Sequence, residues 1–152
     1  MSDLLQRVSA ARMCDLDPWD RRYYALAEHV ASWSKDPRRK VGAALVGQDR
    51  RDVSLGCNGL PPGWDDSRMH DREWKNRWVI HAERNALDRA RFDAKGATLY
   101  VTRTPCTQCA SGLISSGVSR VVCPVPDAAS SWQESQMAVV NHSGLNFVLI
   151  LS

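Results

Sequence analysis

The second half of the chain alternates between helical and extended patterns, and this alternation constrains the fold most. We expect helices over about 81–91, 107–116 and 129–141, followed in turn by the strands "ATLYVTR" (97–103), "SRVVCPV" (119–125) and "NFVLIL" (146–151). Two of these helices lie between successive strands, an order that favours parallel neighbours in one sheet with helices packed on its faces. The pattern therefore favours a layered α/β sandwich.

The first half adds one helix and one hairpin. Asp17 is suited to cap a helix whose first residue is Pro18, and apolar residues recur at helical spacing until Pro37. The run "KVGAALVGQDRRDVSLGCNG" (40–59) has two β-prone stretches around a polar turn. We therefore predict an α/β fold, a three-layer α/β/α sandwich with a central mixed five-stranded sheet.

Two segments carry no clear period. Residues 1–16 have a weak apolar pattern, so we expect an N-terminal arm or short helix before a single domain over 17–152. Residues 59–77 contain glycine, two prolines, many charges and two tryptophans. This predicts a long loop, and long ordered loops in compact domains are often functional.

The bulk composition fits one intracellular domain. A chain of 152 residues with 43% hydrophobic content can bury one substantial core. Its net charge of +3 and pI near 8.7 come from mixed charges, which suit an anionic small ligand but are weak evidence for nucleic acid. No apolar run suits a membrane span or a secretory signal, so we expect a soluble, cytoplasmic protein without membrane partners.

Two short motifs carry the candidate chemistry, "HAERNAL" (81–87) and "TPCTQCA" (104–110). Each alone is a weak signal, because His-x-Glu is common and Cys-x-x-Cys also occurs as a redox pair. Both stand at predicted helix starts after strands, so they should open onto the same edge of the sheet. Inside cells, a close pair such as Cys106 and Cys109 is more often metal-binding or catalytic than a disulfide.

Together the motifs predict a catalytic zinc site. Two thiolates and the neutral imidazole of His81 are three ligands for tetrahedral zinc and leave the fourth position to water. Zinc lowers the pKa of that water, and Glu83 can move protons. H-x-E followed by P-C-x-x-C is typical of zinc deaminases that act on nucleobases. A redox pair would account for neither His81 nor Glu83.

Four blocks resemble the deoxycytidylate deaminases of the cytidine and deoxycytidylate deaminase superfamily, over about residues 24–124. They are "SKDPRRKVGA" (34–43), "GCNGLPPG" (56–63), "HAERNAL" and "GATLYVTRTPCTQCASGLISSGVSRVV" (96–122). The resemblance implies the cytidine deaminase-like fold. The long tryptophan-bearing loop between Asn58 and His81 favours a free nucleotide over the structured RNA that tRNA adenosine deaminases use.

The resemblance also implies the reaction, hydrolysis of dCMP to dUMP. His81, Cys106 and Cys109 would hold one catalytic Zn²⁺, and Glu83 would be the proton shuttle. Water activated by the ion would attack C4 of cytosine, while Glu83 carries its proton to N3 and then to the leaving amine.

Further residues would bind the substrate. The backbone amide of Ala82 would hold the pyrimidine carbonyl, and Asn58 would meet the deoxyribose. Ser34 and Lys35 match a block placed near the phosphate, although a helix C-terminus with a favourable charge explains them equally well. Trp78 stands where relatives often have an aromatic residue, and it would pack on the base or sugar. Packing in the protein core explains a tryptophan at this position at least as well.

Thr104 departs from the family pattern, in which an apolar or aromatic residue usually precedes P-C-x-x-C. The resemblance therefore does not define which residues contact the edge of the pyrimidine, including its C5 atom. We hypothesise that the chain accepts 5-substituted dCMP, such as the methyl or hydroxymethyl form.

The resemblance finally implies assembly and regulation. Many relatives are hexamers activated by dCTP and inhibited by dTTP, with the effector near the loop that "GLPPGWDD" partly preserves. We therefore expect a homo-oligomer, preferably a hexamer, with Mg²⁺ accompanying a nucleotide effector. Two alternatives stay open: a deaminase of another base (tRNA adenosine or a free purine), or a non-catalytic zinc-stabilised binding protein. Glu83 argues against the latter, since a structural site does not need it.

Overall fold

A computed structural model describes residues 6–152 of the chain, so the first part of the expected N-terminal arm lies outside the described residues. The helices are α1 (Pro18–Ala31), α2 (Arg72–Trp78), α3 (Ala82–Arg89), α4 (Thr107–Ser115) and α5 (Gln133–His142). Two 3₁₀ helices are η1 (Met13–Asp15) and η2 (Asp66–His70). The strands are β1 (Val8–Arg12), β2 (Gly42–Val46), β3 (Val53–Cys57), β4 (Thr98–Val101), β5 (Arg120–Pro124) and β6 (Asn146–Leu151).

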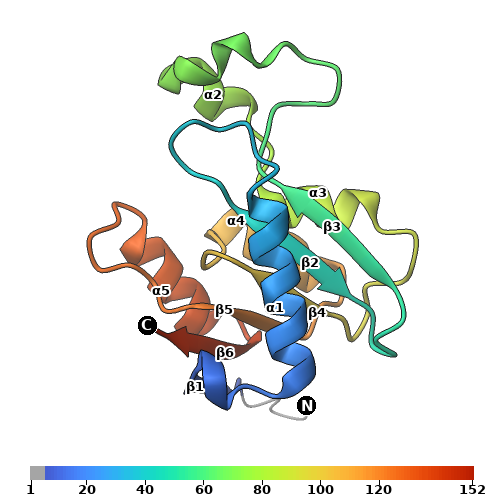
Figure 1. Ribbon diagram of the computed structural model, residues 1–152. Helices are drawn as coiled ribbons and strands as arrows, with labels where there is room; N and C mark the ends of the chain where they lie inside the picture. The colour runs from blue at the N-terminus through green and yellow to red at the C-terminus, as the bar shows by residue number, and fades with distance from the viewer. Residues whose placement is uncertain (1–5) are drawn as a thin grey trace.

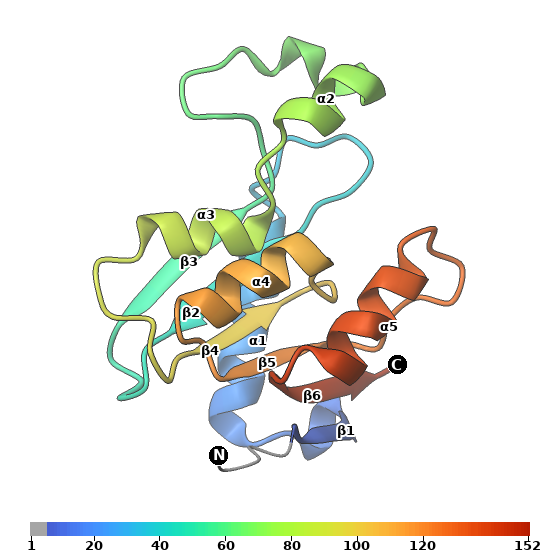
Figure 2. The same cartoon turned by 180° about the vertical axis from the view of Figure 1, so that it is seen from behind.

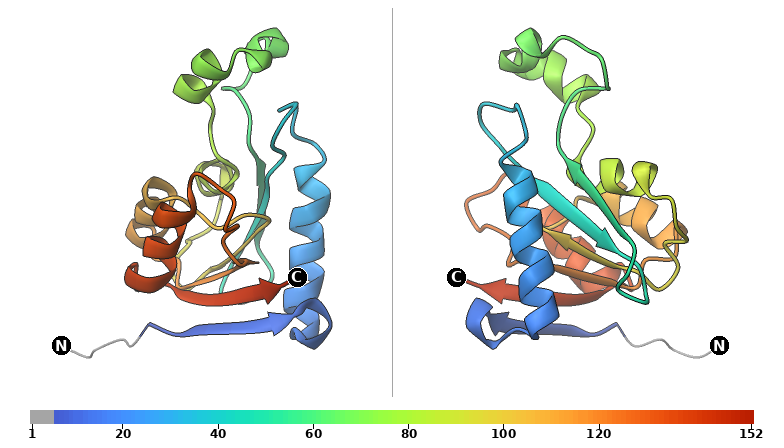
Figure 3. Two further views of the ribbon diagram at one scale, coloured as in Figure 1. Left: turned by 90° about the vertical axis from the view of Figure 1, so that its left-hand side faces the viewer. Right: turned by 45° about the vertical axis from the view of Figure 1, so that its right-hand side comes forward.

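The strands form one mixed sheet in the order β1-β6-β5-β4-β2-β3. Strands β4, β5 and β6 are parallel neighbours, as the alternating pattern predicts, and β2 is antiparallel to both β3 and β4. Helix α1 covers one face of the sheet (Figure 1), and α3, α4 and α5 cover the other (Figure 2). The edge-on view in Figure 3 separates these three layers, so the predicted three-layer sandwich is confirmed.

The expectation of five strands is wrong by one, because β1 adds a sixth. β1 runs parallel to β6, with Val8 opposite Phe147 and Arg12 opposite Leu151. Its side chains are mostly exposed, so the segment lacks the alternation of buried and exposed residues that marks a strand in a sequence. Pairing with the edge of β6 makes it a strand, where the sequence suggested an arm or short helix.

The segment between β3 and α3, residues 59–80, is hereafter called the excursion. The sequence predicts a long loop over residues 59–77, but the excursion contains η2 and α2. Side chains cap both: Asp65 accepts from the Ser67 amide, and Asp71 accepts from the Trp74 amide. The excursion projects beyond the sheet at the top of Figure 1, so α2 has no wide sheet contact to impose an apolar period.

Helix α1 begins as predicted, since the Asp17 side chain accepts hydrogen bonds from the amides of Trp19 and Asp20. It ends at Ala31, before Pro37. The buried Asp20 carboxylate fastens this helix to the sheet by accepting from the Tyr100 hydroxyl at 2.7 Å and from the Arg120 guanidinium at 2.8 Å. No helix in the described part of the chain has the length and apolarity needed to cross a membrane.

Helix α3 lies unusually close to β3. A Cβ atom at Gly56 would stand 2.5 Å from the Ala82 oxygen and from the Ala86 nitrogen, closer than real Cβ contacts allow. Side chains lock the same contact: the Ser54 hydroxyl donates to the Ala86 carbonyl at 2.6 Å, and the Asn85 amide donates to the Cys57 carbonyl at 2.8 Å. Glycine at position 56 thus sets where the helix begins.

Gly56→Ala should therefore destabilise the protein, by about 1–3 kcal/mol as for other overpacked sites. Gly59→Ala is the matched control, because a Cβ there meets nothing within 4 Å. Urea unfolding followed by circular dichroism measures both free energies. Equal losses for the two variants would contradict the close approach described above.

Candidate active site

The starts of α3 and α4 meet at one edge of the sheet. Because β3 and β4 both run antiparallel to β2, their carboxyl ends lie at the same edge. Helix α4 follows β4 directly, whereas the chain returns from the excursion to α3 through a bridge between Gly59 and Ile80. The two helices lie side by side in Figure 2. The sequence expectation that both motifs open onto one edge is thus confirmed.

His81, Cys106 and Cys109 form one cluster at this edge. His81 is the N-cap residue of α3, and Cys106 is the N-cap residue of α4. The Nδ1 atom of His81 lies 3.3 Å from Sγ of Cys109 and 3.7 Å from Sγ of Cys106. All three candidate ligand atoms lie within 4.8 Å of one another.

These separations fit a zinc ion. Zn–S bonds of about 2.3 Å and Zn–N bonds of about 2.0–2.1 Å place tetrahedral nitrogen and sulfur ligands about 3.6 Å apart. The observed 3.3 and 3.7 Å lie on either side of this value. The cluster supplies three donors, two of them sulfur, which is a ligand set typical of catalytic zinc with one position left for water or substrate.

The pKa of Cys106 also suits a metal ligand. The Cys109 thiol and the His81 imidazole, both within hydrogen-bonding reach, lower the pKa of Cys106 to about 4 despite burial. The Cys109 amide at the start of α4 points at the same sulfur, 3.5 Å away. Contact with the Cys106 sulfur in turn raises the pKa of His81. A sulfur held as thiolate at a helix start is prepared for a metal.

Glu83 lies in the first turn of α3, two residues after His81, and is only 4% exposed. Burial raises the pKa of its carboxyl, although the neighbouring Cys109 thiol and the His81 side chain act in the opposite direction. A buried carboxyl with a raised pKa exchanges protons more readily near neutral pH than an exposed one. Its position suits the proton-transfer role that the sequence predicts.

A pocket opens in front of the cluster. Its lining joins the start of α3, the segment after β4, the loop between α1 and β2, and helices α2 and α5. The lining residues are Asp36, Arg39, Val41, Asn58, Lys75, Asn76, Val79, His81, Ala82, Glu83, Arg103, Thr104, Cys106, Trp132 and Gln136. His81, Cys106 and Glu83 therefore face a cavity that a small molecule can enter, whereas Cys109 lines a neighbouring pocket together with His81.

Of the predicted substrate-binding residues, Ala82, Asn58 and Thr104 line this pocket. Asn58 is already heavily engaged: its Oδ1 accepts from the Val41 amide at 2.9 Å, and its Nδ2 donates to the Arg39 carbonyl at 2.8 Å. Its side chain therefore holds the loop between α1 and β2 against the end of β3.

Ser34, Lys35 and Trp78 are not among the residues that line the pocket. The buried Ser34 hydroxyl donates to the Asn58 carbonyl at 2.8 Å. Lys35 forms an exposed ion pair with Asp66 at 3.0 Å. Trp78 is 46% exposed and its ring lies 5.0 Å from that of Trp64, within the excursion. The substrate contacts predicted for these three residues stay predictions.

Thr104 does not present a free hydroxyl. Its Oγ1 donates to the Pro124 carbonyl at 3.0 Å, and its own carbonyl accepts from Nε2 of Gln136 at 3.1 Å. Gln136 is 3% exposed, and its Oε1 has no hydrogen-bond partner among the described residues. A buried acceptor without a partner is uncommon in folded proteins.

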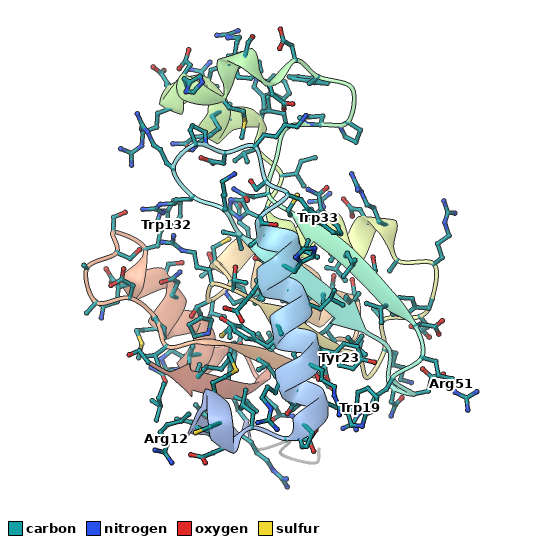
Figure 4. The ribbon with its side chains drawn as sticks, in the orientation of Figure 1. Arg12, Trp19, Tyr23, Trp33, Arg51 and Trp132 are labelled. Carbon is teal, nitrogen blue, oxygen red and sulfur yellow. The ribbon has the colours of Figure 1, made fainter. Side chains whose placement is uncertain are left out.

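The sequence reasoning missed several pocket residues: Asp36, Arg39, Lys75, Arg103, Trp132 and Gln136. No single sequence motif marks these residues, because they come from four separate segments of the chain. Arg103 directly precedes Thr104, which departs from the family pattern, so its place beside that residue offered the best clue. Trp132, labelled in Figure 4, lies just before α5 and reaches the same pocket from a segment 50 residues after Ala82 in the chain.

Several known proteins are similar to this chain in sequence. A model of the "cytidine and deoxycytidylate deaminase zinc-binding region" matches residues 17–125. An uncharacterized deaminase from the luxG 3' region of Aliivibrio fischeri is 43% identical over 122 residues, covering 78% of this chain and 82% of that protein. The deoxycytidylate deaminase of Mycobacterium phage D29 is 39% identical over 121 residues, covering 70% of this chain and 94% of that protein.

A solved structure agrees with these relatives. The dCMP deaminase of cyanophage S-TIM5, in complex with dCMP and dUMP, superposes with a TM-score of 0.68 at 25% identity, covering 87% of this chain and 97% of that one. The matched family region contains all three clustered side chains and Glu83. On these grounds the chain belongs to the cytidine and deoxycytidylate deaminase family.

Proposed function

We propose that this protein catalyses the zinc-dependent hydrolytic deamination of dCMP to dUMP. The observation that carries the proposal is the His81, Cys106 and Cys109 cluster beside the buried Glu83, with His81, Cys106 and Glu83 facing one pocket. The named substrates of the phage D29 and S-TIM5 relatives support it.

The proposed catalytic domain includes more than residues 17–152. Strand β1 belongs to the same sheet, so we extend the proposed domain to include it.

His81, Cys106 and Cys109 would hold the ion. Zinc, when bound, lowers the pKa of water and so makes a nucleophile available at neutral pH. Since Cys106 and Cys109 must not be oxidised to a disulfide if they are to bind metal, a reducing cytoplasmic location belongs to the same proposal.

Glu83 would carry out the proton transfers. It would accept one proton from the attacking water and pass it to N3 of the pyrimidine, and then take the second proton from the hydroxyl group added at C4 and give it to the departing amine. The bond between C4 and the exocyclic nitrogen breaks, ammonia leaves, and the oxygen of the water becomes the 4-carbonyl of dUMP. Burial of Glu83 in the first turn of α3 keeps its carboxyl beside the reacting atoms.

Two contacts would orient the pyrimidine nucleoside. The Ala82 amide stands at the first position of α3, where backbone N–H groups have no partner within the helix, and can donate to the 2-carbonyl. Asn58 lies in the pocket wall and would meet the deoxyribose through the remaining lone pair of its Oδ1.

We also propose a homo-oligomer, preferably a hexamer, that dCTP activates and dTTP inhibits, with Mg²⁺ bound alongside the effector. The excursion supports this, because it presents two partly exposed tryptophans outside the sheet, Trp64 and Trp78, whose tilted rings lie 5.0 Å apart. Exposed aromatic clusters of this kind are enriched in protein interfaces.

Glu83→Gln should abolish catalysis while the zinc stays bound. One general acid or base contributes about 10²–10⁴-fold, and Glu83 acts in every proton transfer, so we expect a loss of kcat beyond that range. An ultraviolet assay with dCMP measures it, and elemental analysis measures zinc. Glu28→Gln, an exposed carboxylate on α1, is the control. Activity surviving in Glu83→Gln would overturn the mechanism.

Cys106→Ala should lose zinc and stability, because the ion would connect the starts of α3 and α4. We expect the chelator-induced fall in melting temperature of the wild-type protein to be absent in this variant. Cys14→Ala, an exposed cysteine far from the cluster in sequence, should retain both metal and chelator response. A zinc-loaded Cys106→Ala protein would remove this residue from the ligand set.

The C5 hypothesis is tested with substrate analogues. We expect 5-methyl-dCMP and 5-hydroxymethyl-dCMP to be turned over within about tenfold of dCMP, because a pocket with room for the added carbon should show less than the about 10–200-fold discrimination of a pocket that excludes one methylene. A larger preference for dCMP would remove the hypothesis. Adenosine and guanine in the same assay test for a deaminase of another base.

A further inference from the structure

Two arginines from separate segments line the pocket. Arg39 comes from the loop between α1 and β2, and Arg103 follows β4. Both line the pocket that contains Glu83 and Cys106. Both also line an adjoining groove with Lys40 and Asp127, so the pocket continues into a mainly basic surface.

The arginine side chains lack carboxylate partners. Neither takes part in an ion pair among the described residues. The Arg103 guanidinium donates one hydrogen bond, to the Ser130 hydroxyl at 2.9 Å, and is half-buried. Burial, and then the nearby like charge of Arg39, lower its pKa, whereas the charges of Asp127 and Glu83, neither of them ion-paired with it, act in the opposite direction. An anion bound between the two arginines would relieve the repulsion between their charges.

The other basic candidates near the pocket are committed elsewhere. Lys75 donates to the buried Asp36 carboxylate at 2.9 Å, and Lys35 pairs with Asp66 on the surface. Lys40 donates to the Ser34 carbonyl. Within the described residues, Arg39 and Arg103 are thus the pocket-lining cations whose forked donors remain available.

We infer that Arg39 and Arg103 bind the phosphate of the nucleotide substrate and make the enzyme select a nucleotide over a nucleoside. The inference rests on the proposed function and deepens it. A guanidinium offers two parallel N–H donors to phosphate oxygens, and two such groups match a dianion. The Ser130 hydroxyl already orients Arg103, which reduces the entropy lost on binding. Ser34 and Lys35, the phosphate candidates from the sequence, lie outside this arrangement.

The test compares dCMP with deoxycytidine, which differ only in the phosphate. Arg39→Gln and Arg103→Gln should each lower kcat/KM for dCMP by about ten- to a hundredfold, as loss of charge-assisted hydrogen bonds does. Deoxycytidine should change less than about threefold. Arg38→Gln is the matched control, because this exposed neighbour does not line the pocket. Zinc content and melting temperature confirm that each variant is folded.

The outcomes are distinct. Equal losses on both substrates, or a dCMP-selective loss in Lys35→Gln but not in the arginine variants, would overturn the inference while the deaminase proposal stands. Absence of turnover of either substrate by the zinc-loaded wild type would defeat the proposed function instead. In that case titration calorimetry with inorganic phosphate tests the arginine pair directly. Phosphate binding to the wild type that is lost in the Arg39→Gln, Arg103→Gln double variant supports the inference, and equal binding to both proteins overturns it.

Discussion

The contact between α3 and β3 at Gly56 determines where the rest of the site can form. The Ala82 oxygen and the Ala86 nitrogen lie so close to this glycine that no side chain fits between them. Hydrogen bonds from Ser54 and Asn85 hold the helix in this position. Because β3 and β4 end at the same edge, the start of α3 then lies beside the start of α4. The ligand cluster and Glu83 follow from this placement, since each belongs to the first residues of one of these helices.

A second constraint is the buried carboxylate of Asp36. It accepts from the amides of Arg38 at 2.9 Å and Arg39 at 3.1 Å, and from the Lys75 ammonium at 2.9 Å. Although burial opposes it, these donors lower the pKa of Asp36. Burying two charges costs free energy that a good ion pair only partly recovers, so the pair is better understood as a positional clamp. It joins the excursion to the loop that carries Arg39.

Much of the architecture was predictable because its signals are local. Period and caps predicted α1, the hairpin and the later alternation, and the Cys-x-x-Cys spacing with His-x-Glu predicted the cluster. β1 was not predictable, because its exposed side chains follow no period and only its pairing with β6 makes it a strand. The sequence and the structure give different candidates for the phosphate contact. The family block at 34–43 indicated Lys35, yet in the fold Lys35 forms an ion pair with Asp66 and does not line the pocket.

The sequence by itself determined the chemistry of the site, since the identity and spacing of His81, Glu83, Cys106 and Cys109 restrict both the metal and the kind of reaction. It also determined the order of helices and strands, which depends on patterns within short windows. Only the tertiary structure decided which side chains surround that chemistry. Arg39, Arg103 and Gln136 are far apart in the chain, and they share a wall because three elements converge at one end of the sheet. Such convergence depends on packing between distant segments, and that packing leaves no periodic trace in the sequence.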